Sequence, residues 1–161
     1  MEEKQITIIC DGSYSPKYNI GTWASIIILD DKEKILTNLQ QNTSQHAMEL
    51  LAVIDSIKYI EQKHTNNYQI TVYTDSAYVE GLIRRQKKLT ASNFKTKKDK
   101  DIANRELVIL FYKTIKDKPL KITEIESHKK KGHSEINDYN RKVDQLARKN
   151  LKKIIKKLHD S

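Results

Sequence analysis

The sequence predicts one α/β domain, with a five-stranded mixed β-sheet flanked by helices on both faces. Isoleucine-rich runs of strand length alternate with longer segments whose apolar residues recur at helical spacing. A strand follows the first helix directly, which requires a crossover connection and therefore some parallel pairing. The chain spans residues 1–161, a length that fits a single domain with its own hydrophobic core.

Three strands and a helix open the chain. Each predicted strand is a short apolar run bounded by turn residues, such as Asp11-Gly12 after the first run. The three strands cover residues 5–10, 22–29 and 34–39. A helix is predicted over residues 44–63, with Ser44 as its N-cap. Its buried face is expected to comprise Leu50, Val53, Ile54, Ile57 and Ile60.

The second half of the chain alternates strands and helices around lysine-rich segments. Two strands are predicted, over residues 68–73 and 120–126. Three helices are predicted, from Asp75-Ser76 to about residue 85, over residues 104–116, and over about residues 141–158. Basic segments separate them, over residues 86–103 and in a loop over residues 127–140.

Charge is placed unevenly along this chain, which carries a formal net charge of +9. Residues 1–80 hold 6 basic and 11 acidic groups, whereas residues 81–161 hold 24 basic and 10 acidic groups. An acidic centre beside a basic half is typical of polyanion binding, although lysine-rich surfaces can serve solubility alone.

One cysteine excludes a disulfide framework and a cysteine-rich zinc site. No apolar run approaches the roughly 20 residues that span a bilayer, and no secretory signal opens the chain. We therefore expect a cytoplasmic protein without membrane association.

Four acidic residues stand at positions typical of a catalytic centre. Asp11 and Asp75 each directly follow a predicted strand, and parallel pairing of those strands would bring the two carboxylates together. Glu49 lies near the start of the first helix among apolar residues, and Asp144 lies one turn into the last predicted helix. Crowded carboxylates repel one another unless a cation lies between them. Oxygen ligands without thiolates favour Mg²⁺ or Mn²⁺.

Each of these acids also has a purely structural interpretation. Asp11 could form an Asx-turn, and Asp75 could cap a helix. Glu49 and Asp144 could respond to the dipoles of the helices that carry them. Taken singly, each acid favours the structural interpretation, so the catalytic hypothesis depends on all four occurring in one consistent topology.

The segments around the four acids carry a family resemblance. They are Cys10-Asp11-Gly12-Ser13, Ala47-Met48-Glu49-Leu50-Leu51-Ala52, Tyr73-Thr74-Asp75-Ser76-Ala77-Tyr78-Val79 and Asn140-Arg141-Lys142-Val143-Asp144-Gln145-Leu146-Ala147. In this order and spacing they resemble type 1 ribonuclease H over about residues 4–150. The resemblance implies a ribonuclease H-like fold. It also implies an endonuclease that hydrolyses the RNA strand of RNA–DNA hybrids, leaving 5′-phosphate and 3′-hydroxyl ends.

The same resemblance implies that Asp11, Glu49, Asp75 and Asp144 are catalytic and metal-binding residues. Two Mg²⁺ ions, with Mn²⁺ as a substitute, would activate the attacking water and stabilise the leaving oxygen. We assign Asp11 to bridge the two ions. Glu49 and Asp75 would complete one metal site, and Asp144 would complete the other.

The family also has a histidine, on a loop after the fifth strand, that assists proton transfer or product release. His128 keeps the family's distance from that strand. His133 keeps the distance to the last acid better, since it lies eleven residues before Asp144 and His128 lies sixteen before it. We favour His128 as the catalytic histidine, with His133 as the alternative.

The resemblance also implies substrate-binding residues near the acids. Ser13, Ser44, Gln45 and Ser76 stand where the family uses small polar or amide side chains. Such groups read the 2′-hydroxyls and backbone shape of a hybrid duplex. One departure concerns the position after Ser76, where many members have Gln and this chain has Ala77, which puts one minor-groove contact in doubt.

The lysine-rich segment over residues 84–100 resembles the family's basic protrusion, which holds the phosphates of the DNA strand. Its lysines would give salt-dependent affinity without sequence preference, whereas a solvated loop is the alternative interpretation. The residues assigned to it are Lys87, Lys88, Phe94, Lys95 and Thr96. The basic last helix receives no binding role, because its lysines could simply cover an exposed face.

We therefore predict a ribonuclease H catalytic domain alone, acting on an RNA–DNA hybrid as a monomer without an obligate protein partner. Two other classes of function stay open. One is a non-catalytic nucleic-acid-binding module with the same fold, although a relic has no reason to keep four like charges together. The other is a related nuclease or integrase-like enzyme that acts on DNA.

Overall fold

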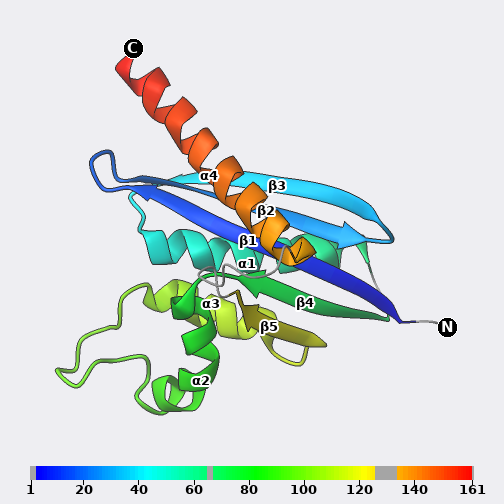
Figure 1. Ribbon diagram of the computed structural model, residues 1–161. Coiled ribbons are helices and arrows are strands. Elements are labelled where there is room, and N and C mark those ends of the chain that lie inside the picture. The colour runs from blue at the N-terminus through cyan, green and yellow to red at the C-terminus, as the bar shows by residue number, and fades with distance from the viewer. Residues whose placement is uncertain (1–2, 65–66, 126–133, 161) are drawn as a thin grey trace.

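A computed structural model describes residues 3–64, 67–125 and 134–160 of the chain. Its five-stranded sheet has the order β3-β2-β1-β4-β5 (Figure 1). The strands are β1 (Lys4–Ser15), β2 (Ile20–Leu29), β3 (Lys32–Gln41), β4 (Tyr68–Thr74) and β5 (Leu120–Glu124). The helices are α1 (Gln45–Lys63), α2 (Ala77–Ala91), α3 (Arg105–Ile115) and α4 (Glu135–His159). Because β1 pairs antiparallel with β2 and parallel with β4, the predicted mixed α/β sheet is confirmed.

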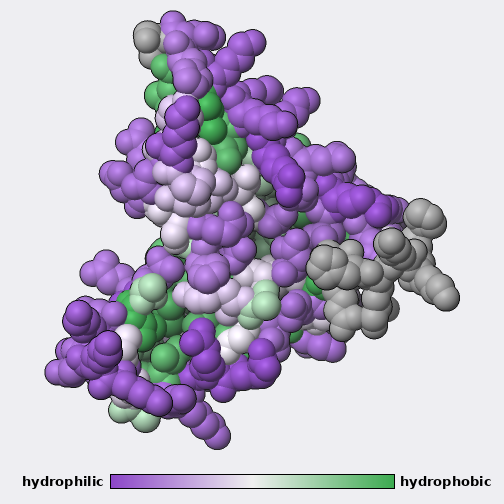
Figure 2. All heavy atoms as spheres, turned by 60° about the vertical axis from the view of Figure 1, so that its left-hand side comes forward, coloured by the Kyte–Doolittle hydropathy of each residue, from purple (hydrophilic) through white to green (hydrophobic). Residues whose placement is uncertain are grey.

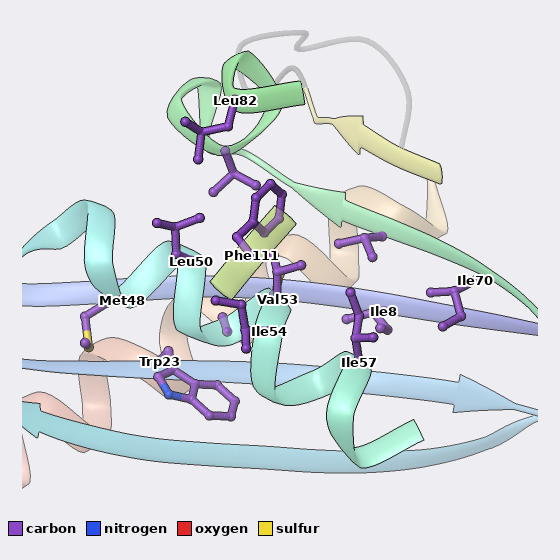
Figure 3. Close-up of a cluster of buried hydrophobic side chains, with 14 of the residues drawn as sticks. Ile8, Trp23, Met48, Leu50, Val53, Ile54, Ile57, Ile70, Leu82 and Phe111 are labelled. Atoms are coloured by element: carbon purple, nitrogen blue, oxygen red, sulfur yellow. The ribbon is translucent and has the colours of Figure 1, made fainter. Parts of the chain in front are cut away.

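Helices cover both faces of the sheet because its central strand buries side chains on both faces. Successive side chains of a strand point to opposite faces. Ile8 and Cys10 of β1 therefore join the cluster beneath α1, α2 and α3, whereas Ile9 joins a second cluster beneath α4. Figure 3 shows the larger cluster, in which Val53 of α1 lies near Phe111 of α3.

The first helix has the cap and the buried face that the sequence predicts. Ser44 is its N-cap, and the Ser44 hydroxyl accepts a hydrogen bond from the Ala47 backbone N–H at 3.1 Å. All five residues of the predicted apolar face are fully buried. This face anchors α1 on the sheet through apolar contact, so the first turn of the helix is held beside β1.

The first strand is longer than predicted, and the prediction that it ends at Cys10 is wrong. β1 continues to Ser15 and pairs with β2 throughout, with Asp11 opposite Ala24 and Ser15 opposite Ile20. Asp11-Gly12 is typical of a turn, but here the antiparallel pairing keeps it extended. Asp11 therefore lies within the strand.

Two helices also differ from their predicted bounds. α2 runs to Ala91 and not to about residue 85, so the start of the predicted basic protrusion is helical. α4 begins at Glu135 and not at about residue 141, because Ser134 caps it and Ile136 packs against the cluster beneath α4. Asp144 therefore lies well inside α4, beyond the first turn in which a helix dipole acts.

The remaining elements lie within two residues of their predicted bounds. β5 ends at Glu124, two residues before its predicted end, and residue 126 lies outside the described part of the chain. The C-terminal end of α4 projects beyond the sheet (Figure 1). In the described part of the chain, no helix is both long enough and apolar enough to cross a membrane.

Candidate active site

One open cavity of about 600 Å³ brings the four predicted acids together. They come from four different parts of the fold, namely β1, α1, the junction between β4 and α2, and α4. The cavity is lined by Asp11, Gly12, Ser13, Tyr14, Gln45, Glu49, Asp75, Asp144, Arg148, Leu151, Lys152 and Ile155. The parallel register pairs Cys10 with Thr74, which places the following residues, Asp11 and Asp75, side by side.

Crowding and burial perturb the two central carboxyls. Burial raises the pKa of Asp11, and the neighbouring charge of Asp75 raises it further. Burial likewise raises the pKa of Asp75, with the charge of Glu49 as the next cause. Asp11 keeps one compensating contact, because its Oδ1 accepts a hydrogen bond from the Gly12 backbone N–H at 2.8 Å. The protein therefore holds like charges together at the expense of its own electrostatic stability.

Glu49 is held by a hydrogen bond at each of its two oxygens. Its Oε2 accepts from the Ser76 hydroxyl at 2.5 Å, and its Oε1 accepts from the Gln45 side-chain amide at 3.2 Å. The same Gln45 amide donates to the Gly12 carbonyl at 2.9 Å, so it links α1 to β1. These contacts orient the Glu49 carboxylate toward the cavity before any ligand binds.

Asp144 is held in place by the packing of α4 on the sheet. Its neighbours Val143 and Ala147 are fully buried, and the Thr22 hydroxyl donates to the Ala147 carbonyl at 2.6 Å. Asp144 Oδ1 accepts from Arg148 Nε at 3.0 Å, one helical turn further on. Asp144 also lies close enough to Asp11 to raise the pKa of the Asp11 carboxyl. The acid from the last helix thus reaches the acids of the sheet.

The donor set fits a hard divalent cation, since it consists of carboxylate oxygens without thiolate or imidazole. Among residues 3–64, 67–125 and 134–160, however, no three acidic, histidine or cysteine side chains already form a ready-made metal cluster. The Asp11 carboxyl instead lies close enough to Asp75 and Asp144 for both of their charges to raise its pKa. A cation among these carboxylates would offset their mutual repulsion, so the residues fit the group chemically.

Gly12 lets β1 and α1 approach closely at the cavity. A Cβ atom at this position would lie 2.8 Å from the Cβ of Met48 and 3.1 Å from the backbone nitrogen of Glu49. Met48 is fully buried, so it has little room to move away. The glycine therefore sets the separation between the strand that carries Asp11 and the helix that carries Glu49.

Gly12→Ala is expected to lower the free energy of unfolding by about 1–3 kcal/mol, the usual cost of overpacking a core. Urea denaturation measures this loss. Gly81→Ala is the matched control, because a Cβ there would meet only Arg84 at 3.7 Å. Gly81 lies inside α2, so its replacement should stabilise the protein by about 0.5–1 kcal/mol. Equal effects of the two substitutions would contradict the role of Gly12.

The predicted substrate-binding residues near the acids divide into two groups. Ser13 and Gln45 line the cavity with the acids. Ser44 lines a separate cavity of about 390 Å³, together with Asn104. Ser76 is buried. Its hydroxyl caps α2 by accepting a hydrogen bond from the Val79 backbone N–H, and it donates a hydrogen bond to Glu49. The structure thus places Ser76 behind Glu49.

The predicted basic protrusion projects from the body of the protein between α2 and α3 (Figure 1). Lys87 and Lys88 are exposed on the last turns of α2. Phe94 instead packs against the core, with its ring 6.2 Å from that of Tyr112. Lys95 forms an isolated β-bridge with Asp101, and the Thr96 N–H donates to the Lys100 carbonyl at 2.7 Å. Phe94 thus anchors this segment to the body.

The two candidate histidines, His128 and His133, lie outside the described residues.

The cavity is also lined by residues that the sequence did not predict as site residues. They are Tyr14 from β1 and Arg148, Leu151, Lys152 and Ile155 from α4. The sequence spacing could have predicted that Arg148 and Lys152 lie near the acids. Arg148 and Lys152 follow Asp144 at four-residue intervals, which places all three on one face of a helix.

Comparisons with known proteins agree on one family. A family model described as RNase H matches residues 3–152. A protein named Ribonuclease H from Caldicellulosiruptor saccharolyticus is 30% identical over 155 residues, which cover 94% of this chain and 99% of its own. Another of that name from Wolbachia pipientis wMel is 35% identical over 150 residues, covering 92% and 97%.

Solved structures share the fold. The PFV RNase H domain superposes with a TM-score of 0.70 at 21% identity, and the match covers 92% of this chain and 95% of that domain. A foamy viral protease-reverse transcriptase in complex with dsDNA gives a TM-score of 0.64 at 14% identity, covering 91% and 92%. At these identities the likeness supports the fold, including the sheet that carries Asp11 and Asp75.

Proposed function

The chain belongs to the RNase H family, and on that premise we propose that it hydrolyses the RNA strand of RNA–DNA hybrids as a metal-dependent endonuclease. It is a ribonuclease H enzyme, and thus a nuclease and a hydrolase. The observation that supports the proposed site is the meeting of Asp11, Glu49, Asp75 and Asp144 in one cavity. We propose that cleavage leaves 5′-phosphate and 3′-hydroxyl ends.

The four carboxylates are the proposed ligands of two Mg²⁺ ions, with Mn²⁺ as a substitute. When bound, such a pair of ions supplies an activated water and stabilises the leaving oxygen. Asp11 is the proposed bridge, because it shares the cavity with Asp75 and Asp144 and the charges of both act on it. Glu49 and Asp75 would serve one ion, and Asp144 would serve the other.

The residues around the acids hold these ligands in position. Ser76 and Gln45 each bind one oxygen of Glu49, which leaves the carboxylate little freedom to rotate. Arg148 orients Asp144 through its Nε. The loop histidine proposed to assist proton transfer or product release is His128, with His133 as the alternative, and both assignments come from the sequence.

Substrate binding is proposed to use both the cavity and the protrusion. Ser13 and Gln45 lie beside the acids, where they could contact the 2′-hydroxyls of the RNA strand. Lys87 and Lys88 of α2 would bind phosphates of the DNA strand, because both are exposed and neither forms an ion pair with a described residue. The continuous sheet and its two clusters support a single catalytic domain, which we propose acts as a monomer.

One cleavage assay tests the proposed function. The protein is incubated with labelled RNA–DNA hybrid, double-stranded RNA and double-stranded DNA, each with Mg²⁺ or with EDTA. We expect cleavage of only the RNA strand of the hybrid, and only with Mg²⁺. Binding without cleavage would favour a non-catalytic module, and cleavage of DNA would favour a related nuclease, so either result would overturn the proposal.

A further inference from the structure

We propose that the C-terminal half of α4 forms a second phosphate-binding wall, in which Lys152, with Arg148 beside it, binds the backbone of the substrate beyond the cleavage site. This inference rests on the function proposed above, since its ligand is a strand of the RNA–DNA hybrid. It assigns a binding role to a helix whose lysines the sequence alone left without one.

The cavity that holds the acids continues along α4. Beyond Asp144 it is lined by Arg148, Leu151, Lys152 and Ile155, so one face of the helix forms its wall over three turns. The rise of about 1.5 Å per residue puts Lys152 about 12 Å along the helix axis from Asp144. A strand advances about 3.4 Å per nucleotide, so Lys152 would meet phosphates about three to four nucleotides from the acids.

The two cations of this wall are available to an anion. Lys152 is exposed and forms no ion pair with any carboxylate in the described part of the chain. The Arg148 side chain is 68% exposed and uses its Nε for Asp144, while its terminal nitrogens have no ion-pair partner among the described acids. Both side chains can therefore point donors into the cavity without breaking an existing contact.

The end of β1 also lines this cavity, and the β1–β2 connection that follows it contacts α4. Tyr14 lines the cavity from β1, and its hydroxyl donates to the Asn19 side chain at 2.7 Å. The Tyr18 ring meets the His159 ring edge to face, with 5.4 Å between centroids, and its hydroxyl hydrogen-bonds with the imidazole. This contact ties the β1–β2 connection to the last turn of α4, so it helps to hold the C-terminal half of α4 beside β1.

The chemistry of the wall suits a nucleic-acid backbone. Ile155, which is half-buried, and Leu151, which is largely buried, add apolar surface to the same wall. Sugars can pack on such surface while phosphates meet the charges. Figure 2 shows apolar side chains along the upper part of the molecule, where α4 lies, flanked by hydrophilic ones. Ile155 and the rest of the helix to His159 lie beyond residue 152, where the match to the family model ends.

The other flank of α4 offers a matched control. Lys153 and Lys157 line a different cavity, of about 340 Å³, together with Thr37 and Asn38 of β3. These lysines share the helix, the charge and the exposure of Lys152, but they face away from the acids. If the hybrid were held by general electrostatic attraction, lysines on both sides of α4 would contribute equally to binding. The proposed wall instead predicts that Lys152 contributes and Lys153 does not.

The test compares Lys152→Ala with Lys153→Ala in hybrid binding under EDTA across a series of salt concentrations. Loss of one phosphate contact lowers the slope of log K against log salt by about 1 and weakens binding roughly 5- to 10-fold near 0.1 M salt. We expect this result for Lys152→Ala, and partial or full rescue by Lys152→Arg. Lys153→Ala should bind like the unaltered protein.

Hybrids shortened on one side locate the contact. Trimming the duplex beyond the cleavage site should abolish the effect of Lys152→Ala for one end only, because α4 leads away from the acids in a single direction. Equal effects of Lys152→Ala and Lys153→Ala, or no effect of either, would overturn the wall while the protein still cleaves the hybrid. If the unaltered protein neither binds nor cleaves the hybrid, the proposed function fails and the wall fails with it.

Discussion

Asp75→Asn should reduce hybrid cleavage by at least about 10³-fold while leaving the fold intact, because metal-ion stabilisation of a phosphoryl transition state is worth several kcal/mol. The substitution keeps the shape of the side chain and removes the negative charge that a cation needs. Asp75 follows β4 directly and lines the cavity with Asp11 and Glu49, so its charge belongs to the group proposed to hold the cations. Initial rates of hybrid cleavage with Mg²⁺ measure the loss.

The same substitution should raise the melting temperature of the metal-free protein. Burial and the charge of Glu49 raise the pKa of Asp75, so the folded state loses stability as the pH rises above the ordinary aspartate pKa, and the loss is complete above the raised pKa. A neutral amide removes this cost. Asp117→Asn is the control, because Asp117 is exposed and has a φ of 56°, a conformation that Asn also adopts readily. Retained metal-dependent cleavage by Asp75→Asn would overturn the proposed active site.

Phe111→Ala should lower the free energy of unfolding by about 3–5 kcal/mol. Phe111 is fully buried in the larger cluster, near Val53 of α1 (Figure 3), and its ring centroid lies 5.7 Å from that of Tyr112. Removing its ring leaves a cavity that the surrounding helices cannot fill. Because a domain is typically stable by only about 5–15 kcal/mol, the midpoint of urea denaturation should fall steeply.

The Phe111 substitution should act on stability alone. No residue of α3 lines the cavity that holds the acids, so the folded fraction of Phe111→Ala should cleave hybrid at a rate near that of the unaltered protein. Phe111→Leu retains most of the volume and should lose less than about 1.5 kcal/mol. A loss for Phe111→Ala as small as that expected for Phe111→Leu would mean that the ring does not fill this part of the core.

Much of the fold follows from local patterns in the chain. The apolar face of α1, from Leu50 to Ile60, was predictable because helical spacing puts those residues on one side and burial there stabilises the helix. The parallel neighbourhood of β1 and β4 followed from the crossover through α1. Asp75 at the end of β4 was placed by the same reasoning.

Other features depend on partners distant in sequence. Asp11-Gly12 has the local signature of a turn, yet pairing with β2 keeps it extended inside β1. The start of α4 at Glu135 depends on Ile136 and Tyr139 packing against the sheet, contacts that no local window contains. Local propensity is weak compared with burial and pairing, so the tertiary context decides such boundaries.

The order of the elements, the four acids and the basic character of the second half could all be predicted from residue type and spacing, because hydrophobic periodicity and charge act locally. The folded chain was needed to show that Ser76 holds Glu49, that Gly12 sets the approach of α1 to β1, and that Arg148 and Lys152 extend the wall of the cavity. These relations join groups far apart along the chain, and close packing of the folded core determines which of them come into contact.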